Sequence, residues 1–519
     1  MSFAVPLAET LTMPSFQYRA MAPVLVVLGA AVVSVLVEGL VPRGARRGIQ
    51  LTLVGASLIA ALVLVIATTA SQEGVVASGS LVVDGPTLFL QTTILIVALL
   101  AMLVAAEQKV DPAGDAFAPS ASALVGSAEE RQLTTLGRSQ TEIWPLFLFS
   151  LSGLLLFPAA NDLLMLFVAL EVLSLPLYLL AGMARRRRLL SEQASLKYFL
   201  LGAFASAFLL YGSAMLYGYA GSLQFGAIAD AFRDRPGALG LQVLGVTLVG
   251  VGLLFKVAAV PFHMWTPDVY QGSPTPISGF MAAGVKIAAF GAMLRVFYVA
   301  LGGASWDWAP ALWAVAIATM LVGVLLAVTS SDIKRMLAYS ATSHAGFLLL
   351  GVIAYSTAAV SATMFYLLAY GLITIGAFAV VMLVRGPSGE AGHLSAWAGL
   401  GRRSPVVAGV FTLFLLALAG IPLTSGFTAK FGVFAAALHS GAVAPVLVAV
   451  LASAISAFFY LKVIVLMFFT KPPSDAPEIV VPSYLTRTAI AVAAVGTVLL
   501  GVFPQSVLDL ANQSATFLR

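Results

Sequence analysis

Apolar runs of about 20 residues alternate with short polar connections along almost the whole chain. One such run, wound as a helix, spans the roughly 30 Å hydrocarbon core of a bilayer, so each run predicts a membrane-crossing helix. We predict fourteen spans, at residues 20–41, 49–70, 86–107, 142–160, 162–183, 194–220, 239–262, 276–301, 309–328, 333–355, 358–385, 404–438, 443–470 and 485–505. The predicted fold class is therefore all-α, a polytopic membrane protein with about 14 transmembrane helices.

Two of these spans are interrupted. The seventh contains Pro261, and the twelfth contains the turn IPLTSGF from Ile421 to Phe427. Proline lacks the backbone N–H that a helix interior needs, so both spans should be broken helices. The broken helix is the fourth member of spans four to eight and also of spans nine to thirteen. This arrangement predicts two inverted five-helix repeats, as in many transporters.

The repeats set the expected domain boundaries. We expect an N-terminal three-helix segment at 1–107, a cytoplasmic loop at 108–141, a first helix repeat at 142–301, a second helix repeat at 309–470 and a C-terminal helix at 471–519. The long loop mixes both charge signs with alanine, glycine and serine. We therefore expect a mobile connection that carries no chemistry.

The composition excludes a soluble protein. Of the 519 residues, 60% are hydrophobic and only 9% are charged, and the mean hydropathy is +1.01. A soluble domain carries roughly 25% charged residues. The net charge of +5 does not indicate a nucleic-acid partner, because the basic residues lie in the connections between apolar runs.

The distribution of these basic residues predicts the orientation in the membrane. The connections leaving odd-numbered spans hold seventeen lysines and arginines: Arg43, Arg46, Arg47, Lys109, Arg131, Arg138, Arg185, Arg186, Arg187, Arg188, Lys334, Arg335, Arg385, Arg402, Arg403, Lys471 and Arg487. The connections leaving even-numbered spans hold only Arg233 and Arg235. Because positive charge stays on the cytoplasmic side, both termini should face the non-cytoplasmic side. The run Arg185 to Arg188 is explained as a topology signal and a contact to lipid headgroups.

The chain offers no set of residues for a redox cofactor or a metal. It has no cysteine, which excludes disulfides, thiolate-bound iron–sulfur clusters and a cysteine nucleophile. Its four histidines, His263, His344, His393 and His439, include no pair at i, i+4 spacing. The nucleotide motif GxxxxGK[ST] does not occur either. We therefore expect neither a cofactor nor a metal in this chain, and the energy for its work must come from elsewhere.

Three lysines inside apolar spans are the strongest indication of chemistry: Lys256, Lys286 and Lys430. A lysine at the bilayer centre costs about 2.5–3.5 kcal/mol, so such residues are rare and face a partner or a water-filled path. Lys256 and Lys286 lie in consecutive spans around the Pro261 break, and Lys430 follows the second break. This pattern predicts a path for ions.

Glu171 is the acidic residue expected to pair with Lys256. It lies in the middle of the fifth span, where an unpaired carboxylate is costly. Burial favours the neutral form of a lysine, while a nearby carboxylate favours the charged form. A lysine that alternately gains and loses such a partner can take up and release a proton. The alternative is a static ion pair that fixes helix packing.

Further polar residues lie close to these lysines in the sequence. His263 lies in the break, where it either relays protons between Lys256 and Lys286 or binds the backbone groups that the break frees. His344 and Tyr339, both in the tenth span, either extend a hydrated chain or form a satisfied buried pair.

Three other basic residues are ambiguous. Lys197, near the start of the sixth span, is either part of the path or extends its ammonium to the interface. Lys462 and Arg295 are better explained by anchoring at helix ends or by contacts between subunits.

Several of these segments together resemble a known family. FKVAAVPFHMWTPDVYQGSPTP, GVKIAAF, LEVLSLPLY, KRMLAYSATSHAGF and AGIPLTSGFTAKFGVF are similar to the antiporter-like membrane subunits of bacterial proton-pumping NADH:quinone oxidoreductase, complex I, which are related to Mrp-type cation/proton antiporters. The resemblance runs from about Trp144 to Lys471. Among the paralogues it favours the one with lysine at the position of Lys286, where another tends to have histidine, and with lysine at Lys430, where one has glutamate. The long C-terminal lateral helix of the largest paralogue has no counterpart in this sequence.

The resemblance also implies roles for individual residues. Glu171 would be the acid of the fifth span and Lys256 its partner in the seventh. His263 and Lys286 would continue a central hydrated axis, and Lys430 would be the terminal lysine in the broken twelfth helix. The loop at 109–141 is longer than the family usually has.

The function implied by the resemblance is proton translocation across the bacterial plasma membrane, coupled to electron transfer from NADH to quinone. NADH, FMN, iron–sulfur clusters and quinone would all be bound by partner subunits. The expected partners are antiporter-like paralogues, small membrane subunits, the peripheral arm and the lipid bilayer, with no nucleic acid. The alternatives are an Mrp-type cation/proton antiporter subunit and a structural spacer whose lysines merely pair with acids.

Overall fold

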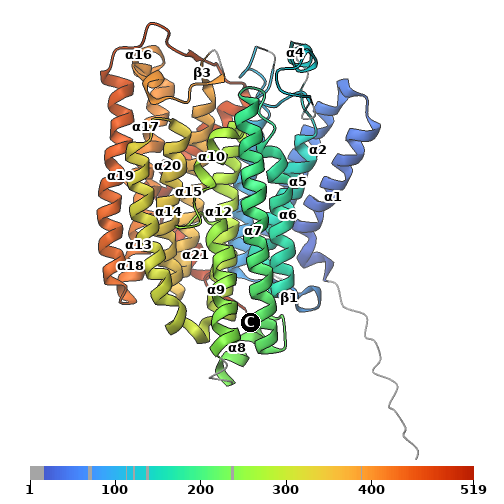
Figure 1. Ribbon diagram of the computed structural model, residues 1–519, viewed down its shortest axis with the longest axis vertical. Coiled ribbons are helices and arrows are strands. Elements are labelled where there is room, and N and C mark those ends of the chain that lie inside the picture. The colour runs from blue at the N-terminus through green and yellow to red at the C-terminus, as the bar shows by residue number, and fades with distance from the viewer. Residues whose placement is uncertain are drawn as a thin grey trace, which may run out of the picture.

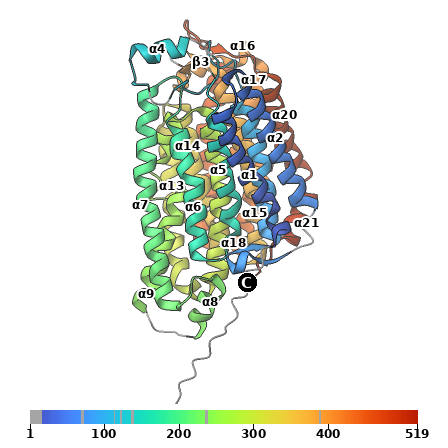
Figure 2. The same ribbon diagram turned by 90° about the vertical axis from the view of Figure 1, so that its right-hand side faces the viewer.

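The computed structural model describes residues 17–67, 73–112, 114–120, 123–135, 139–234, 239–386 and 389–518. It is an elongated bundle of helices that run roughly parallel to its long axis (Figures 1 and 2). Eleven described helices are long and apolar enough to cross a membrane: α1 (Tyr18–Leu40), α2 (Arg43–Ala67), α3 (Gly85–Ala105), α6 (Leu163–Ala181), α7 (Arg188–Ala220), the composite helix Thr275–Ala300, the segment Gly302–Thr329 with α13 (Ser305–Thr329), α14 (Ile333–Ile353), α15 (Thr357–Leu383), α19 (Val443–Phe469) and α20 (Tyr484–Val502).

Shorter apolar helices account for the remaining predicted spans. They are α5 (Ile143–Leu156, extended by a 3-10 turn at Phe157–Ala159), α9 (Leu239–Lys256) and α17 (Pro405–Ala419). Each of the fourteen predicted spans thus corresponds to an apolar helix, and the all-α prediction is confirmed. Proline and glycine at the interruptions explain why α9 and α17 are short.

Short elements either cover the two ends of the bundle or complete its broken passes. The short helices are α4 (Ala128–Thr135), α8 (Phe225–Asp234), α10 (Thr266–Gly272), α16 (Leu400–Arg403), α18 (Ser425–His439) and α21 (Gln505–Gln513). The strands β1 (Gly74–Val76) and β2 (Leu81–Val83) form an antiparallel hairpin, and β3 (Val384–Gly386), β4 (Gly389–Glu390) and β5 (Glu478–Ile479) form a sheet in the order β4-β3-β5. Figure 1 shows α4, α16 and β3 at one end and α8 and the C-terminus at the other. We call the end with α4, α16 and β3 the basic end.

Both predicted breaks are present. The seventh pass leaves the helix after Lys256, where Ala258 adopts a φ of 62°, and resumes as α10. The break was predicted at Pro261, but α9 already ends at Lys256. The helix stops before the proline because a proline cannot continue it. The twelfth pass stops at Gly420, whose φ of 87° ends α17, and resumes as α18.

The eighth pass carries two irregularities that the sequence did not predict. α11 (Thr275–Phe280) continues through a π-helical turn at Met281–Val285 into α12 (Lys286–Arg295) and a second π-helical turn at Val296–Ala300. Such turns widen a helix locally and are frequent at functional sites. Lys286 directly follows the first of them. This composite helix, α14 and α15 are almost completely covered by other helices, so they form the centre of the bundle.

Several described residues of the loop between α3 and α5 are bonded to the arginine run that follows α6, which the sequence did not predict. Two of the three guanidinium nitrogens of Arg186, Nε and Nη2, donate to Asp111, at 2.7 and 3.0 Å. Arg185 pairs with Asp115 at 2.6 Å, and Arg188 donates to the carbonyl of Ser120. Three of the four arginines predicted to contact lipid headgroups therefore bind this loop instead.

Candidate functional site

Lys256 is the last residue of α9 and is buried, with 4% of its surface exposed. Its Nζ donates to Ser174 Oγ at 2.7 Å and to the Tyr198 hydroxyl at 3.3 Å. The same ammonium lies 5.4 Å from the centre of the Tyr198 ring, within cation–π range. The lysine is therefore held by hydroxyl groups and an aromatic ring.

Glu171 does not form the direct ion pair with Lys256 that the sequence predicted. It lies in α6, one turn before Ser174, and its Oε1 is buried without a hydrogen-bond partner among the residues that the structure describes. The carboxylate still acts on Lys256 through space. Ser174, one turn further along the same face of α6, accepts from the ammonium instead. The described hydrogen bonds thus join Lys256 to Ser174 and Tyr198, and none joins it to Glu171.

The turn after Lys256 is supported by side chains from other helices. The indole N–H of Trp265 donates to the carbonyl of Phe255 at 3.1 Å, and its ring stacks on Tyr198 at 4.7 Å. The backbone N–H of Val260 donates to Thr319 Oγ1 of α13 at 2.9 Å. Because these bonds satisfy backbone groups that the break frees, an irregular turn is tolerated inside the bundle.

His263 bonds to a backbone group inside the break, which was one of its two predicted roles. Its ring lies against the backbone of Pro261, and its Nδ1 has no hydrogen-bond partner among the described residues. Tyr270 of α10 lies between Tyr198, which contacts Lys256, and Tyr370, which contacts Lys286. It lies edge-on to Trp265 at 6.3 Å, and its hydroxyl is near enough to interact electrostatically with those of Tyr198 and Tyr370.

Lys286 lies in the centre of the bundle, with 3% of its surface exposed. Its Nζ donates to the carbonyl of Ala341 in α14. It also lies 5.4 Å from the centre of the Tyr370 ring. The preceding π-helical turn sets where this ammonium enters the space between α12, α14 and α15.

His344 lies between Lys286 and Lys430. Its Nδ1 is 2.7 Å from the Tyr366 hydroxyl and its Nε2 is 3.5 Å from that of Tyr460. Its ring is 5.2 Å from the ring of Tyr370, which Lys286 also contacts. Both of its nitrogens therefore face hydroxyl groups that can donate or accept a proton.

Tyr339 does not join His344. Five residues along a helix place two side chains on different faces, and Tyr339 lies beside Arg335 near the basic end. The buried pair, one of the two predicted alternatives, is therefore wrong, and Tyr366 and Tyr460 are the partners of the histidine.

Lys430 lies on the other side of His344 from Lys286. Its Nζ donates to the carbonyl of Ala419 at 2.9 Å and to Ser453 Oγ at 3.0 Å. Ala419 is the last residue of α17, so the ammonium lies at the negative end of a half-helix, which favours a cation. It also lies 5.0 Å from the ring of Phe347, which in turn packs against His344 at 5.6 Å.

The structure thus connects the predicted lysines through residues that the sequence analysis did not select. Hydroxyl and aromatic groups fill the intervals between the charged groups: Ser174, Tyr198, Tyr270, Tyr370, Tyr366 and Tyr460. The available signal was a tyrosine inside an otherwise apolar span, since a buried hydroxyl needs a partner. We call Glu171, Lys256, Lys286, His344, Lys430 and these six residues the polar row.

Lys197 belongs to a separate cluster near the basic end. Its Nζ donates to Asp268 of α10, and Arg335 of α14 donates to the same carboxylate at 2.6 Å. About a third of each of these side chains is exposed. Lys197 therefore reaches the surface, as one of its two predicted roles required, but there it forms an ion pair between helices.

A second cluster at this end makes stability depend on pH. Lys334 donates to the carbonyl of Ser273 at 2.7 Å and to Glu390 at 3.3 Å, and Arg385 lies 3.4 Å from Glu390. Burial raises the pKa of Glu390, but Lys334 and Arg385 outweigh it and hold the pKa at about 2, below the ordinary 4.5. This stabilisation is complete above about pH 4.5 and is lost as the pH falls towards 2.

We expect Glu390→Gln to lower the free energy of opening of the α14 N-terminus by about 3 kcal/mol at neutral pH. The measurement is hydrogen exchange of the amides around Lys334, corrected for intrinsic rates. The difference from wild type should stay constant from neutral pH to about 5 and shrink at lower pH. Glu478→Gln, at an exposed carboxyl of β5, is the control and should have no such effect. A difference that persists unchanged at pH 3 would contradict the assignment.

The described residues contain no cluster of histidine, aspartate or glutamate that could hold a metal ion. The polar row therefore offers proton-carrying groups along a buried line, with nothing arranged to bind a metal.

Comparisons with known proteins identify the family of this chain. The family model described as "NADH:quinone oxidoreductase/Mrp antiporter, TM" matches residues 160–456. NADH-quinone oxidoreductase subunit N of Rhodococcus opacus is 57% identical over 100% of this chain and 99% of its own. The Mycobacterium tuberculosis protein of the same name is 52% identical over 98% of this chain and 99% of its own.

Solved structures give the same result. A chain of respiratory complex I from Thermus thermophilus superposes with a TM-score of 0.76 and 34% identity, covering 94% of this chain and 99% of its own. A chain of the Mrp complex from Dietzia superposes with a TM-score of 0.77 but only 25% identity, covering 95% of this chain and 97% of its own. The chain therefore belongs to the NADH:quinone oxidoreductase/Mrp antiporter membrane family and, within it, to the group of NADH-quinone oxidoreductase subunit N proteins.

Proposed function

We propose that this chain translocates protons across the plasma membrane as a membrane subunit of NADH:quinone oxidoreductase, along the polar row. The observation that carries the proposal is the placement of His344 between two buried lysines. Lys286 and His344 share contact with Tyr370, and His344 and Lys430 share contact with Phe347. Neither lysine forms an ion pair with a described carboxylate, so its charge is not permanently compensated.

This arrangement can move charge stepwise. A buried ammonium without a paired carboxylate is costly, so each lysine is poised between its charged and neutral forms. Like charges repel strongly at low dielectric, so a proton on one group of the row disfavours a proton on the next. The hydroxyls of Tyr366 and Tyr460 offer His344 partners in either protonation state. Protonation at one end of the row can thus be transmitted to the other.

Partner subunits supply the energy. NADH, FMN, the iron–sulfur clusters and quinone are bound by other subunits of the enzyme, and this chain carries the proton path. Its partners are the other membrane subunits and, through them, the peripheral arm. The basic end, with Arg185 to Arg188, Arg402 and Arg403, faces the cytoplasm in this proposal, and both termini face the other side.

The two five-helix units frame the path. α5, α6, α7, α9 with α10, and the composite helix Thr275–Ala300 make the first unit, and α13, α14, α15, α17 with α18, and α19 make the second. Each unit has five passes, so the second begins on the opposite side of the membrane, as inverted repeats require. The fourth helix is broken in both units. We place Lys256 and Lys430 as the lysines associated with these two breaks.

A cation/proton antiporter working without NADH is the alternative. The relatives named subunit N exceed 50% identity, whereas the Mrp chain has 25%, which favours the oxidoreductase. Purification of the chain under mild conditions separates the two functions. A subunit of the oxidoreductase should copurify with flavin and iron–sulfur subunits, and an antiporter should not.

We expect His344→Gln to reduce NADH-driven proton uptake several-fold in membrane vesicles. Glutamine can keep hydrogen bonds to Tyr366 and Tyr460 but cannot carry the proton, so the interval between Lys286 and Lys430 is interrupted. The measurement is the initial rate of uptake, normalised to the amount of assembled complex. His439→Gln, at an exposed histidine near the end of α18, should retain the wild-type rate. Equal rates in both variants would remove His344 from the path.

A further inference from the structure

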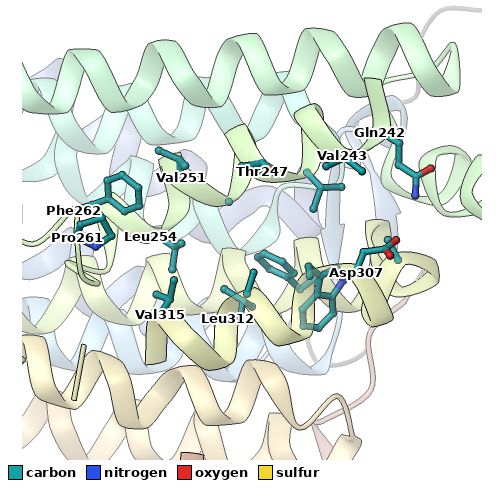
Figure 3. Close-up of a pocket in the computed structure, with 16 residues that line it drawn as sticks. Gln242, Val243, Thr247, Val251, Leu254, Pro261, Phe262, Asp307, Leu312 and Val315 are labelled. Atoms are coloured by element: carbon teal, nitrogen blue, oxygen red, sulfur yellow. The ribbon is translucent and has the colours of Figure 1, made fainter. Parts of the chain in front are cut away.

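A groove opens on the side of the bundle between α9 and α13, where the two five-helix units meet. Its volume is about 320 Å³, and its walls are mostly valine, leucine, phenylalanine and alanine. α9 packs on α7 and α13 packs on α14, and a gap remains between α9 and α13. Figure 3 shows side chains of both helices facing this space, from Gln242 and Asp307 at one end to Pro261 and Phe262 at the other.

The two ends of the groove differ in chemistry. Gln242 and Asp307 make the mouth polar, and Trp306, next to Asp307, is 91% exposed. Exposed tryptophans gather at the headgroup level of a bilayer, which sets the depth of the mouth. The other end is closed by Phe262 and by the turn after Lys256, which is bonded to α13 through Thr319.

The length of the groove matches one leaflet. From Gln242 to Leu254 the wall runs twelve residues of helix, or about 18 Å. Half of a hydrocarbon core is roughly 15 Å deep. A chain that enters at the headgroup level would therefore end near the middle of the membrane, against Phe262. This geometry fits a lipid acyl chain lying along α9.

The polar residues at the mouth, Gln242 and Asp307, favour one class of lipid headgroup. Asp307 is exposed and belongs to none of the ion pairs among the described residues, so its carboxylate can accept from an ammonium group. The Gln242 amide, on the opposite wall, can donate to a phosphate oxygen. A headgroup with a phosphate and a primary ammonium meets both requirements, and an anionic headgroup would be repelled by Asp307.

We propose that the groove between α9 and α13 is a binding site for an aminophospholipid such as phosphatidylethanolamine, with an acyl chain along α9 and the headgroup at Gln242 and Asp307. The site lies in the leaflet opposite the basic end. The chain end packs on Phe262 and thereby covers the lipid-facing side of the turn that follows Lys256.

The test uses the complete complex in nanodiscs that contain phosphatidylethanolamine with a photoreactive acyl chain. After irradiation, mass spectrometry of peptides should find adducts enriched on α9 and α13. Gly250 lines the groove, and a Cβ there would meet no atom within 4 Å, so Gly250→Phe directs a ring into the groove. We expect it to lower the adducts several-fold. Ala311→Phe fills the groove from α13, at an exposed position, and should act in the same way.

The controls separate this site from general contact with lipid. Gly29→Phe, at an equally open glycine on the exposed face of α1, should leave the adducts unchanged. A phosphatidylglycerol probe with the same chain should label less, and Asp307→Asn should remove that difference. Three results would overturn the proposal: equal labelling of Gly250→Phe and wild type, no preference between the two lipids, or adducts no more frequent than on the exposed face of α19. Crosslinks from Val243→Cys to a partner subunit would also overturn it, since a protein would then cover the groove.

Discussion

Replacing Lys256 by methionine is expected to lower NADH-driven proton uptake and the coupled reduction of quinone by about 10-fold or more, as loss of an essential proton-transfer group does. Methionine fills much of the same space but cannot carry a proton. Ser174 and Tyr198 would then lose the ammonium that they bind. The measurement combines proton uptake in vesicles, NADH oxidation and a check that the complex has assembled.

Two variants make this result specific. Lys462→Met removes a lysine from the exposed face of α19, where no path is proposed, and should leave both activities intact. Glu171→Gln keeps the size of the acid but removes its charge, so it should impair proton uptake if the carboxylate biases Lys256 through space. If Lys256→Met assembles and keeps both activities, the lysine is structural and the proposed path is wrong. If only Glu171→Gln is silent, the acid is not part of the path.

The largest effect on stability is expected from Arg295→Met. Arg295 is fully buried and donates to Asp84 at 2.6 Å, to Thr87 at 2.8 Å and to the carbonyl of Pro158 at 2.8 Å. Removing one partner of a buried ion pair leaves the other charge uncompensated, which costs about 3–5 kcal/mol. We expect a lower temperature of unfolding and less chain in assembled complexes, measured by thermal inactivation and native electrophoresis.

A double variant identifies the cause. Arg295→Met with Asp84→Asn removes both charges and should recover a substantial part of the lost stability, because a neutral amide costs less to bury than a carboxylate. Arg233→Met, in an exposed ion pair with Asp230 and Asp234, is the control and should change stability little. If the double variant is no more stable than Arg295→Met, the effect comes from lost packing and not from the unpaired carboxylate.

Arg295 has a role that the sequence did not predict. It was explained by anchoring at a helix end or by a subunit contact, yet it connects α12 to the N-cap of α3, across 211 positions of the chain. Asp84 Oδ2 additionally accepts from the backbone N–H of Leu518, so the same pair holds the C-terminal segment. Nothing local to Arg295 indicates these partners, since they come from three distant segments.

The membrane spans, their number and their breaks were determined by the sequence alone. Hydrophobicity over about 20 residues is a local property, and proline or glycine interrupts a helix wherever it falls. The lysines of the path were equally evident, because a charge in an apolar span stands out without any knowledge of its neighbours. The bias of basic residues to alternate connections also depends only on the order of the spans.

Only the tertiary structure decided what surrounds these charges. Ser174 and Tyr198 bind Lys256, Tyr270 lies near both Tyr198 and Tyr370, and His344 has its partners on α15 and α19. Described residues of the loop after α3 are bonded to Arg185 and its neighbours, and the groove beside α9 arose where two helices do not meet. In each case the contact joins residues far apart in the chain. Its geometry depends on how whole helices pack, and hydrophobicity along the chain does not encode that packing.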